Sequence, residues 1–369
     1  MPLAENIKRL RVTKGLTQAQ VAEQAGLSRV AFRDIETGKT QSPRVGNLQS
    51  IAEALGARLQ DLLAEPPRLE TVRFRSKKLR TSKARERRKE IVVNVARWLQ
   101  DFNGLEEILA CEKPYALSDV AKKAASWRSS DRGKKAAVAA REALGLEADE
   151  PIRDICGLLE SAGVKIRIVD SALESFFGLS VGPEDGGPAI VVNVREDITV
   201  ERRIFTAAHE LGHLLLHPGA YDVEEVEEDE AEEREAHLFG SHFLVPQEGF
   251  DKEWEESAGL HPVDRVLHVK RIFRVSYMTI LYRLIEMGIA NEHIWPWFNA
   301  EYRRIYGESF GRKEEPLPLA PADFVEDRLS RMVRRALEKE EISLSRAAEI
   351  LGEDLYAMRE RAAAWEHVK

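Results

Sequence analysis

Two histidines four residues apart, His209 and His213, stand on either side of a glutamate in the run His-Glu-Leu-Gly-His. Apolar residues recur at helical spacing from Val200 to His217, so we expect both imidazoles on one face of a helix. Two such imidazoles can share a tetrahedral zinc ion, and Glu210 can take a proton from a water at the open position. The spacing therefore predicts Zn2+ as cofactor and Glu210 as general base. The alternative is that both histidines are ordinary core or surface residues.

A catalytic zinc needs a third protein ligand, for which His217 is the nearest candidate in sequence. Two turns of helix, about 12 Å, separate it from His209, and this is too far for ligand bonds of about 2 Å. A second apolar helix stripe downstream, extended back by two turns, lands on Glu233. We therefore expect Glu233 to bind the metal and His217 to have a supporting or structural role. The alternative for Glu233 is one more solvated carboxylate in the acidic run Asp222–Glu235.

A different chemistry is indicated at the N-terminus, where residues Leu3 to Leu63 show five short helical patterns that end before Pro66 and Pro67. The second and third patterns form a helix-turn-helix, in which Ser28 is placed to cap the helix that would enter a DNA groove. Arginine suits guanine, and an apolar side chain suits the thymine methyl group. The side chains expected to contact DNA are Gln18, Ser28, Arg29, Val30, Arg33, Asp34, Lys39 and Arg44.

The residues around the two histidines resemble those of the ImmA/IrrE-type zinc metallopeptidases, over roughly Ile152–Gly288. The resemblance rests on Phe205–His217, on Ile190–Asn193 before it, and on the run that begins at Glu233. It implies Glu233 as third zinc ligand and cleavage of a helix-turn-helix repressor, which switches on stress or mobile-element genes. It also implies that the strand ending in Asn193 is an edge strand that pairs with an extended substrate.

The chain departs from that family pattern at His237, where Asn or Asp is usual, and at Gly240, where Ala is usual. His237, His242 and Tyr221 are candidates for stabilising an oxyanion, and the sequence does not choose among them. The acidic residues from Asp222 to Glu232 are interpreted either as a loop that covers the cleft or recruits a basic repressor, or as a solvated run.

The N-terminal helices resemble the phage-repressor type of helix-turn-helix domain, the XRE family, across essentially all of Leu3–Leu63. This resemblance implies binding to double-stranded operator DNA, commonly as a homodimer on a two-fold site. The alternative is a five-helix module that is retained for protein contacts alone.

Composition and length are compatible with both motifs. A chain of 369 residues is long enough for two or three domains, and its two cysteines, Cys111 and Cys156, offer neither a disulfide framework nor a cysteine zinc site. No apolar run is long enough to cross a membrane, and no secretory signal is recognisable, so we expect a cytoplasmic protein. The net charge is −8, yet residues 1–89 carry about +11, which favours nucleic acid at the N-terminal end. The alternative for Arg68–Lys89 is a solvated charged linker.

These patterns predict a mainly helical fold with a small α+β domain. We expect a five-helix DNA-binding domain over residues 1–66 and a basic, helical connection over 67–150. A zincin-like peptidase domain with a small antiparallel sheet follows over 151–298, with strands near 163–170, 176–181 and 189–194. A helical extension covers residues 299–369.

The function that follows is a transcriptional regulator with a zinc-dependent endopeptidase that cleaves a repressor-type protein, or itself within the Pro66–Glu90 linker. One alternative is a non-proteolytic regulator or antitoxin whose peptidase-like domain senses a ligand or binds a partner. The other is a housekeeping peptidase with a vestigial N-terminal domain.

Overall fold

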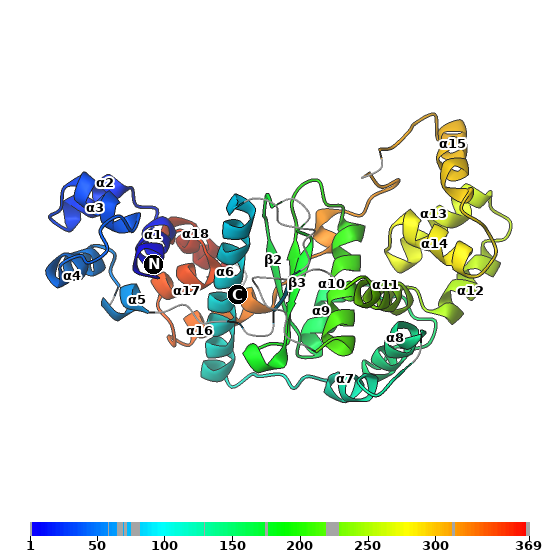
Figure 1. The fold of residues 1–369 in the computed structure, drawn as a ribbon, viewed down its shortest axis with the longest axis horizontal. Coiled ribbons are helices and arrows are strands. Elements are labelled where there is room, and N and C mark those ends of the chain that lie inside the picture. The colour runs from blue at the N-terminus through cyan, green and yellow to red at the C-terminus, as the bar shows by residue number, and fades with distance from the viewer. Residues whose placement is uncertain are drawn as a thin grey trace. The chain divides into compact units, whose positions relative to one another are not determined.

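The computed structural model describes residues 2–57, 59–64, 69, 72–74, 82–128, 130–173, 176–218, 229–311 and 314–366. The chain divides into two compact units (Figure 1), one comprising residues 1–68, 93–112 and 327–369 and the other residues 69–92 and 113–326. Each unit has a hydrophobic core of its own. The described residues are mostly helical with one small sheet, which confirms the expected fold class.

The first unit begins with five helices: α1 (Pro2–Thr13), α2 (Gln18–Gln24), α3 (Arg29–Glu36), α4 (Val45–Ala54) and α5 (Leu59–Leu63). Thr17 and Gln20 form a reciprocal capping box at the start of α2, and the Ser28 hydroxyl accepts a hydrogen bond of 3.1 Å from the Ala31 amide at the start of α3. Ile7, Phe32 and other buried side chains from all five helices form the core. The helix-turn-helix therefore has the local geometry that its caps predict.

The same unit contains the end of α6 (Ser82–Leu109) together with α16 (Arg328–Glu338), α17 (Leu344–Leu351) and α18 (Leu355–Glu366). Arg328 forms a buried ion pair with Glu106 of α6, and Arg9 of α1 forms an ion pair with Glu349 of α17. A further ion pair joins Arg346 to α6. The C-terminal helices thus pack with the helix-turn-helix in one compact unit.

The second unit is built around a four-stranded sheet in the order β1-β3-β4-β2. Its strands are β1 (Val72–Phe74), β2 (Lys165–Val169), β3 (Gly178–Val181) and β4 (Ala189–Asn193). The β1–β3 and β3–β4 pairs are antiparallel, but β2 pairs with β4 in parallel. The sheet is therefore mixed, where the sequence predicts an antiparallel one, because the β3–β4 hairpin returns its second strand beside β2. Strand β1 lies in the region that the sequence predicts to be helical.

The second unit also contains the helices α7 (Ser118–Ala124), α8 (Arg132–Ala143), α9 (Ile155–Ser161), α10 (Val200–Leu216), α11 (Glu230–Leu244), α12 (Gln247–Glu256), α13 (Pro262–Phe273), α14 (Tyr277–Glu286) and α15 (Ile294–Tyr306). Helix α10 packs against β3, β4 and α11 (Figure 1). A side chain at Gly178 of β3 would lie 2.6 Å from the Thr206 Cγ2 atom and 2.9 Å from the Val191 carbonyl oxygen. Glycine is needed there because only it lets α10 approach the sheet this closely.

Three charged side chains lie together in the core of the second unit. The Lys270 Nζ atom is 3.1 Å from a carboxylate oxygen of Glu201 and 3.1 Å from one of Glu315, and all three side chains are almost completely buried. Lys270 also donates a hydrogen bond of 2.8 Å to the Pro316 carbonyl oxygen. One cation thus compensates two buried carboxylates and anchors the segment that begins at Glu315.

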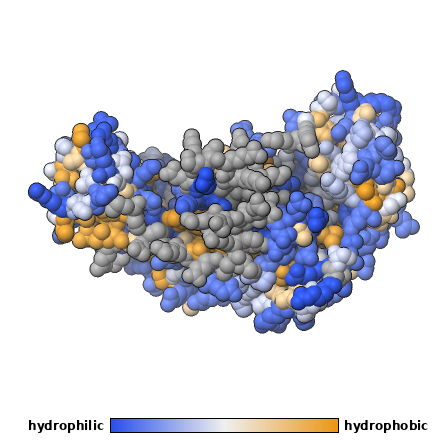
Figure 2. All heavy atoms as spheres, in the orientation of Figure 1, coloured by the Kyte–Doolittle hydropathy of each residue, from blue (hydrophilic) through white to orange (hydrophobic). Residues whose placement is uncertain are grey.

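The visible surface of the described residues is largely hydrophilic, with hydrophobic residues in scattered patches (Figure 2). Every helix in the described part of the chain is too short or too polar to span a lipid bilayer.

Candidate metal centre

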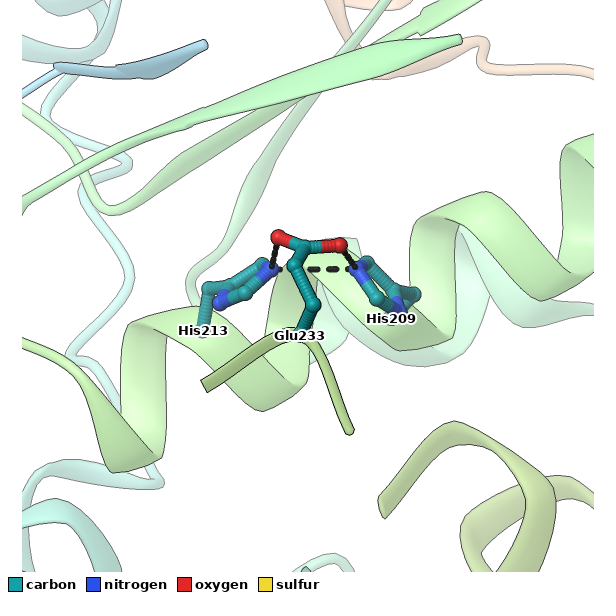
Figure 3. A group of neighbouring side chains, drawn as sticks. All are labelled: His209, His213 and Glu233. Carbon is teal, nitrogen blue, oxygen red and sulfur yellow. Dashed lines mark hydrogen bonds and ion pairs between the residues drawn. The ribbon is translucent and has the colours of Figure 1, made fainter. Parts of the chain in front are cut away.

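The side chains of His209, His213 and Glu233 converge on one point between α10 and α11 (Figure 3). The two Nε2 atoms of the histidines are 3.0 Å apart, and the Glu233 carboxylate oxygens lie 3.3 Å from the Nε2 atom of His209 and 3.1 Å from that of His213. One ligand atom from each residue lies within 4.8 Å of the others. Two imidazole nitrogens and one carboxylate oxygen in this arrangement are a donor set that fits zinc and leaves a fourth position for water.

Helical periodicity explains why these groups meet. Thr199 caps the start of α10, and its hydroxyl accepts a hydrogen bond of 3.3 Å from the Arg202 amide. The four-residue spacing then places His209 and His213 on the same face of α10, where both are buried. On α11, Gly240 lies only 3.5 Å from the backbone of His209, measured from its ideal Cβ position, so the two helices are in close contact.

The protonation states of His213 and Glu233 suit metal binding. Burial lowers the pKa of His213 to about 4, so its imidazole is neutral at pH 7. Burial alone would raise the pKa of Glu233, but hydrogen bonds with His209 and His213 outweigh burial and lower it. The His213 imidazole is therefore uncharged and the Glu233 carboxylate negatively charged, as metal binding requires.

Glu210 lies beside these ligands on α10 and is fully buried. Its Oε2 atom accepts a hydrogen bond of 2.9 Å from the Ser180 hydroxyl of β3. Sequence analysis does not identify Ser180, although a serine in a strand whose residues are all buried is a usable signal for a polar partner. The hydrogen bond holds the Glu210 carboxylate in a fixed orientation between the helix and the sheet.

His217 lies between His213 and Glu235 and contacts both side chains. Its Nδ1 atom is 3.0 Å from the Nδ1 atom of His213, and its Nε2 atom is 2.9 Å from the Glu235 Oε2 atom. Arg132 in turn lies 3.0 Å from the same carboxylate. Since His213 directs Nε2 at the cluster, its Nδ1 atom carries the proton and donates to His217, which donates to Glu235. The chain of contacts fixes the tautomer and the orientation of the His213 ring.

The three oxyanion candidates have different surroundings. His237 is exposed on α11, and its ring centroid is 4.8 Å from that of Phe205 and 6.3 Å from that of His209. His242 is held by two residues of α14, Glu286 at 3.1 Å and Arg283 at 2.9 Å. Tyr221 lies outside the described residues, as does most of the acidic run before Asp229. Of the candidates within the described part of the chain, His237 is the one whose ring lies near that of His209.

The expectation that the strand ending in Asn193 is a free edge is wrong. Strand β4 lies between β3 and β2, so both of its edges are already paired. The Asn193 side chain is fully buried, donates hydrogen bonds to the carbonyl oxygens of Ser171 and Phe176, and accepts one from the Ser171 amide. Its amide group therefore joins the loop before β3 to the end of β4.

In the helix-turn-helix, the predicted DNA-contacting residues form two groups. The side chains of Arg29, Val30, Arg33, Lys39 and Arg44 are exposed, and Asp34 is partly exposed at 3.1 Å from Arg33. Ser28 caps α3, while Gln18 forms a hydrogen bond with the buried Glu36. Glu36 also pairs with Arg11, at 2.5 Å, and thus links α1, α2 and α3. Sequence analysis does not identify this linking role.

Two regions of the chain match known protein families. Residues 159–285 match the family described as the IrrE N-terminal-like domain, a peptidase family, and residues 2–65 match a helix-turn-helix domain family. The chain is 37% identical over 65 residues to the immunity repressor protein of Bacillus phage phi105, and these residues make up 18% of this chain and 44% of that protein. The alignment thus covers less than half of that relative. The expected pair of resemblances is confirmed: residues 2–65 are similar to a helix-turn-helix domain family and residues 159–285 to the IrrE N-terminal-like family.

Proposed function

We propose that the chain is a transcriptional regulator whose IrrE-type domain is a zinc-dependent endopeptidase, acting on a repressor-type protein or on its own chain. The observation that carries this proposal is the convergence of His209, His213 and Glu233, with the Glu210 carboxylate beside them. A structural zinc site is closed by four protein ligands, whereas three ligands with an adjacent carboxylate are typical of hydrolytic sites.

The residues of the chain have separate tasks in peptide hydrolysis. Zinc held by the three ligands would polarise the scissile carbonyl and lower the pKa of a water molecule to about 7. Glu210 accepts a proton from the attacking water and passes it to the leaving amine. Ser180 fixes the Glu210 carboxylate at 2.9 Å, so the base is oriented before the substrate arrives. His217 keeps His213 in the tautomer that presents Nε2.

The N-terminal domain supplies DNA recognition in this proposal. The exposed side chains of Arg29, Val30 and Arg33 at the start of α3 are placed to reach base edges in a major groove. Lys39 and Arg44, also exposed, are suited to phosphate contacts. The similarity to a phage immunity repressor supports binding to double-stranded operator DNA, which we propose to occur as a homodimer in the cytoplasm.

The test follows the intact mass of the full chain over time, alone and with the helix-turn-helix protein encoded nearest to its gene. The zinc-loaded chain is compared with the same chain after chelation and with the Glu210→Gln variant. We expect a defined cleavage product that forms about 10²- to 10⁴-fold more slowly in the variant, since that is the usual contribution of a general base. Equal rates in both proteins, or no product from either substrate at zinc saturation, would overturn the proposal.

A further inference from the structure

Strand β1 lies along the strand that carries the partner of Glu210. It pairs antiparallel with β3, in a register that sets Arg73 directly opposite Ser180 and Val72 opposite Val181. Cross-strand neighbours in an antiparallel pair project to the same face of the sheet. Because the Ser180 side chain reaches Glu210, the Arg73 side chain projects to the face on which the catalytic helix α10 lies.

The side chain of Arg73 bridges from the sheet to α11. It forms an ion pair with Glu232, the residue before the metal ligand Glu233. Both side chains of the pair are largely shielded, with 11% of Arg73 and 32% of Glu232 exposed. Strand β1 therefore lies beside the candidate catalytic centre, held by main-chain pairing and by the Arg73–Glu232 ion pair.

We infer that β1 occupies the place of a peptide substrate along β3, and that Glu232 selects a basic side chain in that substrate. This inference rests on the proposed function. Strand addition to a sheet edge uses main-chain hydrogen bonds, which any extended segment can supply, so specificity comes from the side-chain positions. In the structure this position along β3 is occupied by β1 of the same chain, and its Arg73 side chain pairs with Glu232.

A substrate of the same kind must then displace β1. When a site is blocked by a segment of its own chain, the apparent dissociation constant of a competitor is the intrinsic one divided by the fraction of open sites. Weakening the Arg73–Glu232 pair should therefore strengthen the binding of a competing peptide without any new contact. In this inference β1 is an inhibitory segment of the chain itself, and the substrate is an extended basic segment of a partner protein.

The experiment measures binding of a fluorescent peptide with the sequence of residues 68–78 to the full, zinc-loaded chain in the Glu210→Gln background. Fluorescence anisotropy gives the affinity, and no turnover is required. We expect Arg73→Glu to tighten peptide binding by about tenfold or more, because the repelled β1 leaves β3 open. The matched control is Arg87→Glu, which makes the same charge change on an exposed residue of α6 whose ion pair, with Glu90, stays within that helix. It should leave the affinity unchanged.

Three further measurements separate the expected result from misfolding. Combining Arg73→Glu with Glu232→Arg restores the ion pair with reversed charges and should return binding of the original peptide to the weak level or below. A second peptide, with glutamate at the position of Arg73, should bind the single variant Arg73→Glu about tenfold more weakly than the original peptide does, because Glu232 repels it. Amide hydrogen exchange of residues 178–181 should rise in Arg73→Glu and fall again when the original peptide is added.

Equal peptide affinity in Arg73→Glu and Arg87→Glu, or unchanged exchange in β3, would overturn the inference. Failure of the proposed function looks different. The peptide could bind, and exchange in β3 could change as expected, while the chain with Glu210 intact never cleaves the peptide. That result would support the strand-binding site and refute the peptidase assignment.

Discussion

Replacing His217 with alanine should weaken zinc binding without removing a zinc ligand. The substitution leaves the Nδ1 proton of His213 buried and without the acceptor that now lies 3.0 Å away. A buried donor that loses its partner costs about 1–3 kcal/mol, which corresponds to about 5- to 150-fold in a dissociation constant. Loss of an outer partner of a ligating histidine usually weakens metal binding by about 10- to 100-fold. We therefore expect a loss of about one to two orders of magnitude.

The assay is a zinc competition titration against a chromophoric chelator, performed on the purified full chain. His293→Ala is the matched control, because His293 is exposed at the start of α15. Thermal unfolding of the zinc-free proteins separates metal affinity from stability. If His217→Ala binds zinc as tightly as His293→Ala, the ordering of the His213 ring by His217 is refuted. The ordering is also refuted if the loss of zinc affinity is fully explained by a lower thermal stability of the zinc-free His217→Ala chain.

Four further variants have expected outcomes. Lys270→Met should lower the free energy of unfolding by about 3–5 kcal/mol in chemical denaturation, because it leaves two buried carboxylates without their cation; a loss below about 1 kcal/mol would contradict this. Replacing Arg29 and Arg33 by alanine should weaken operator binding and reduce its salt dependence in a titration at several salt concentrations, and unchanged affinity would favour the protein-contact alternative. Gly240→Ala should leave the free energy of unfolding unchanged or raise it by up to about 1 kcal/mol, because the nearest atom to the new methyl group would be 3.5 Å away. Gly133→Ala should lower the free energy of unfolding, because its methyl group would lie 2.5 Å from a backbone oxygen. Thermal melting of the two glycine variants compares them directly, and equal effects would refute the packing argument.

The features that could be predicted from the sequence are those that depend on residues close together in the chain. The four-residue spacing of His209 and His213 fixes their common face on α10, and the Ser28 cap fixes the start of α3. Glu233 could be found because its own helix has a clear apolar stripe. The strands around residues 165–193 are also visible in the sequence as short apolar alternations.

The remaining features depend on pairing between distant segments. Strand β1 has only three residues in a basic run, and its partner β3 is more than one hundred positions away, so no local pattern marks it. The contact of Ser180 with Glu210 and the link from Arg132 through Glu235 to His217 also join different elements, so spacing along the chain does not identify the partners. The edge assignment of Asn193 failed because strand order in a sheet is set by crossovers and not by the alternation within a strand.

X-ray absorption at the zinc edge of the purified, zinc-loaded chain measures the ligand set of the candidate catalytic centre directly. We predict two imidazole nitrogens at about 2.0–2.1 Å together with oxygen ligands at about 2.0–2.2 Å from Glu233 and water. The Glu233→Gln variant should lose zinc or show an altered oxygen shell. A shell of three imidazoles, a closed set of four protein ligands, or a spectrum that is unchanged by Glu233→Gln would contradict an open hydrolytic site at His209, His213 and Glu233.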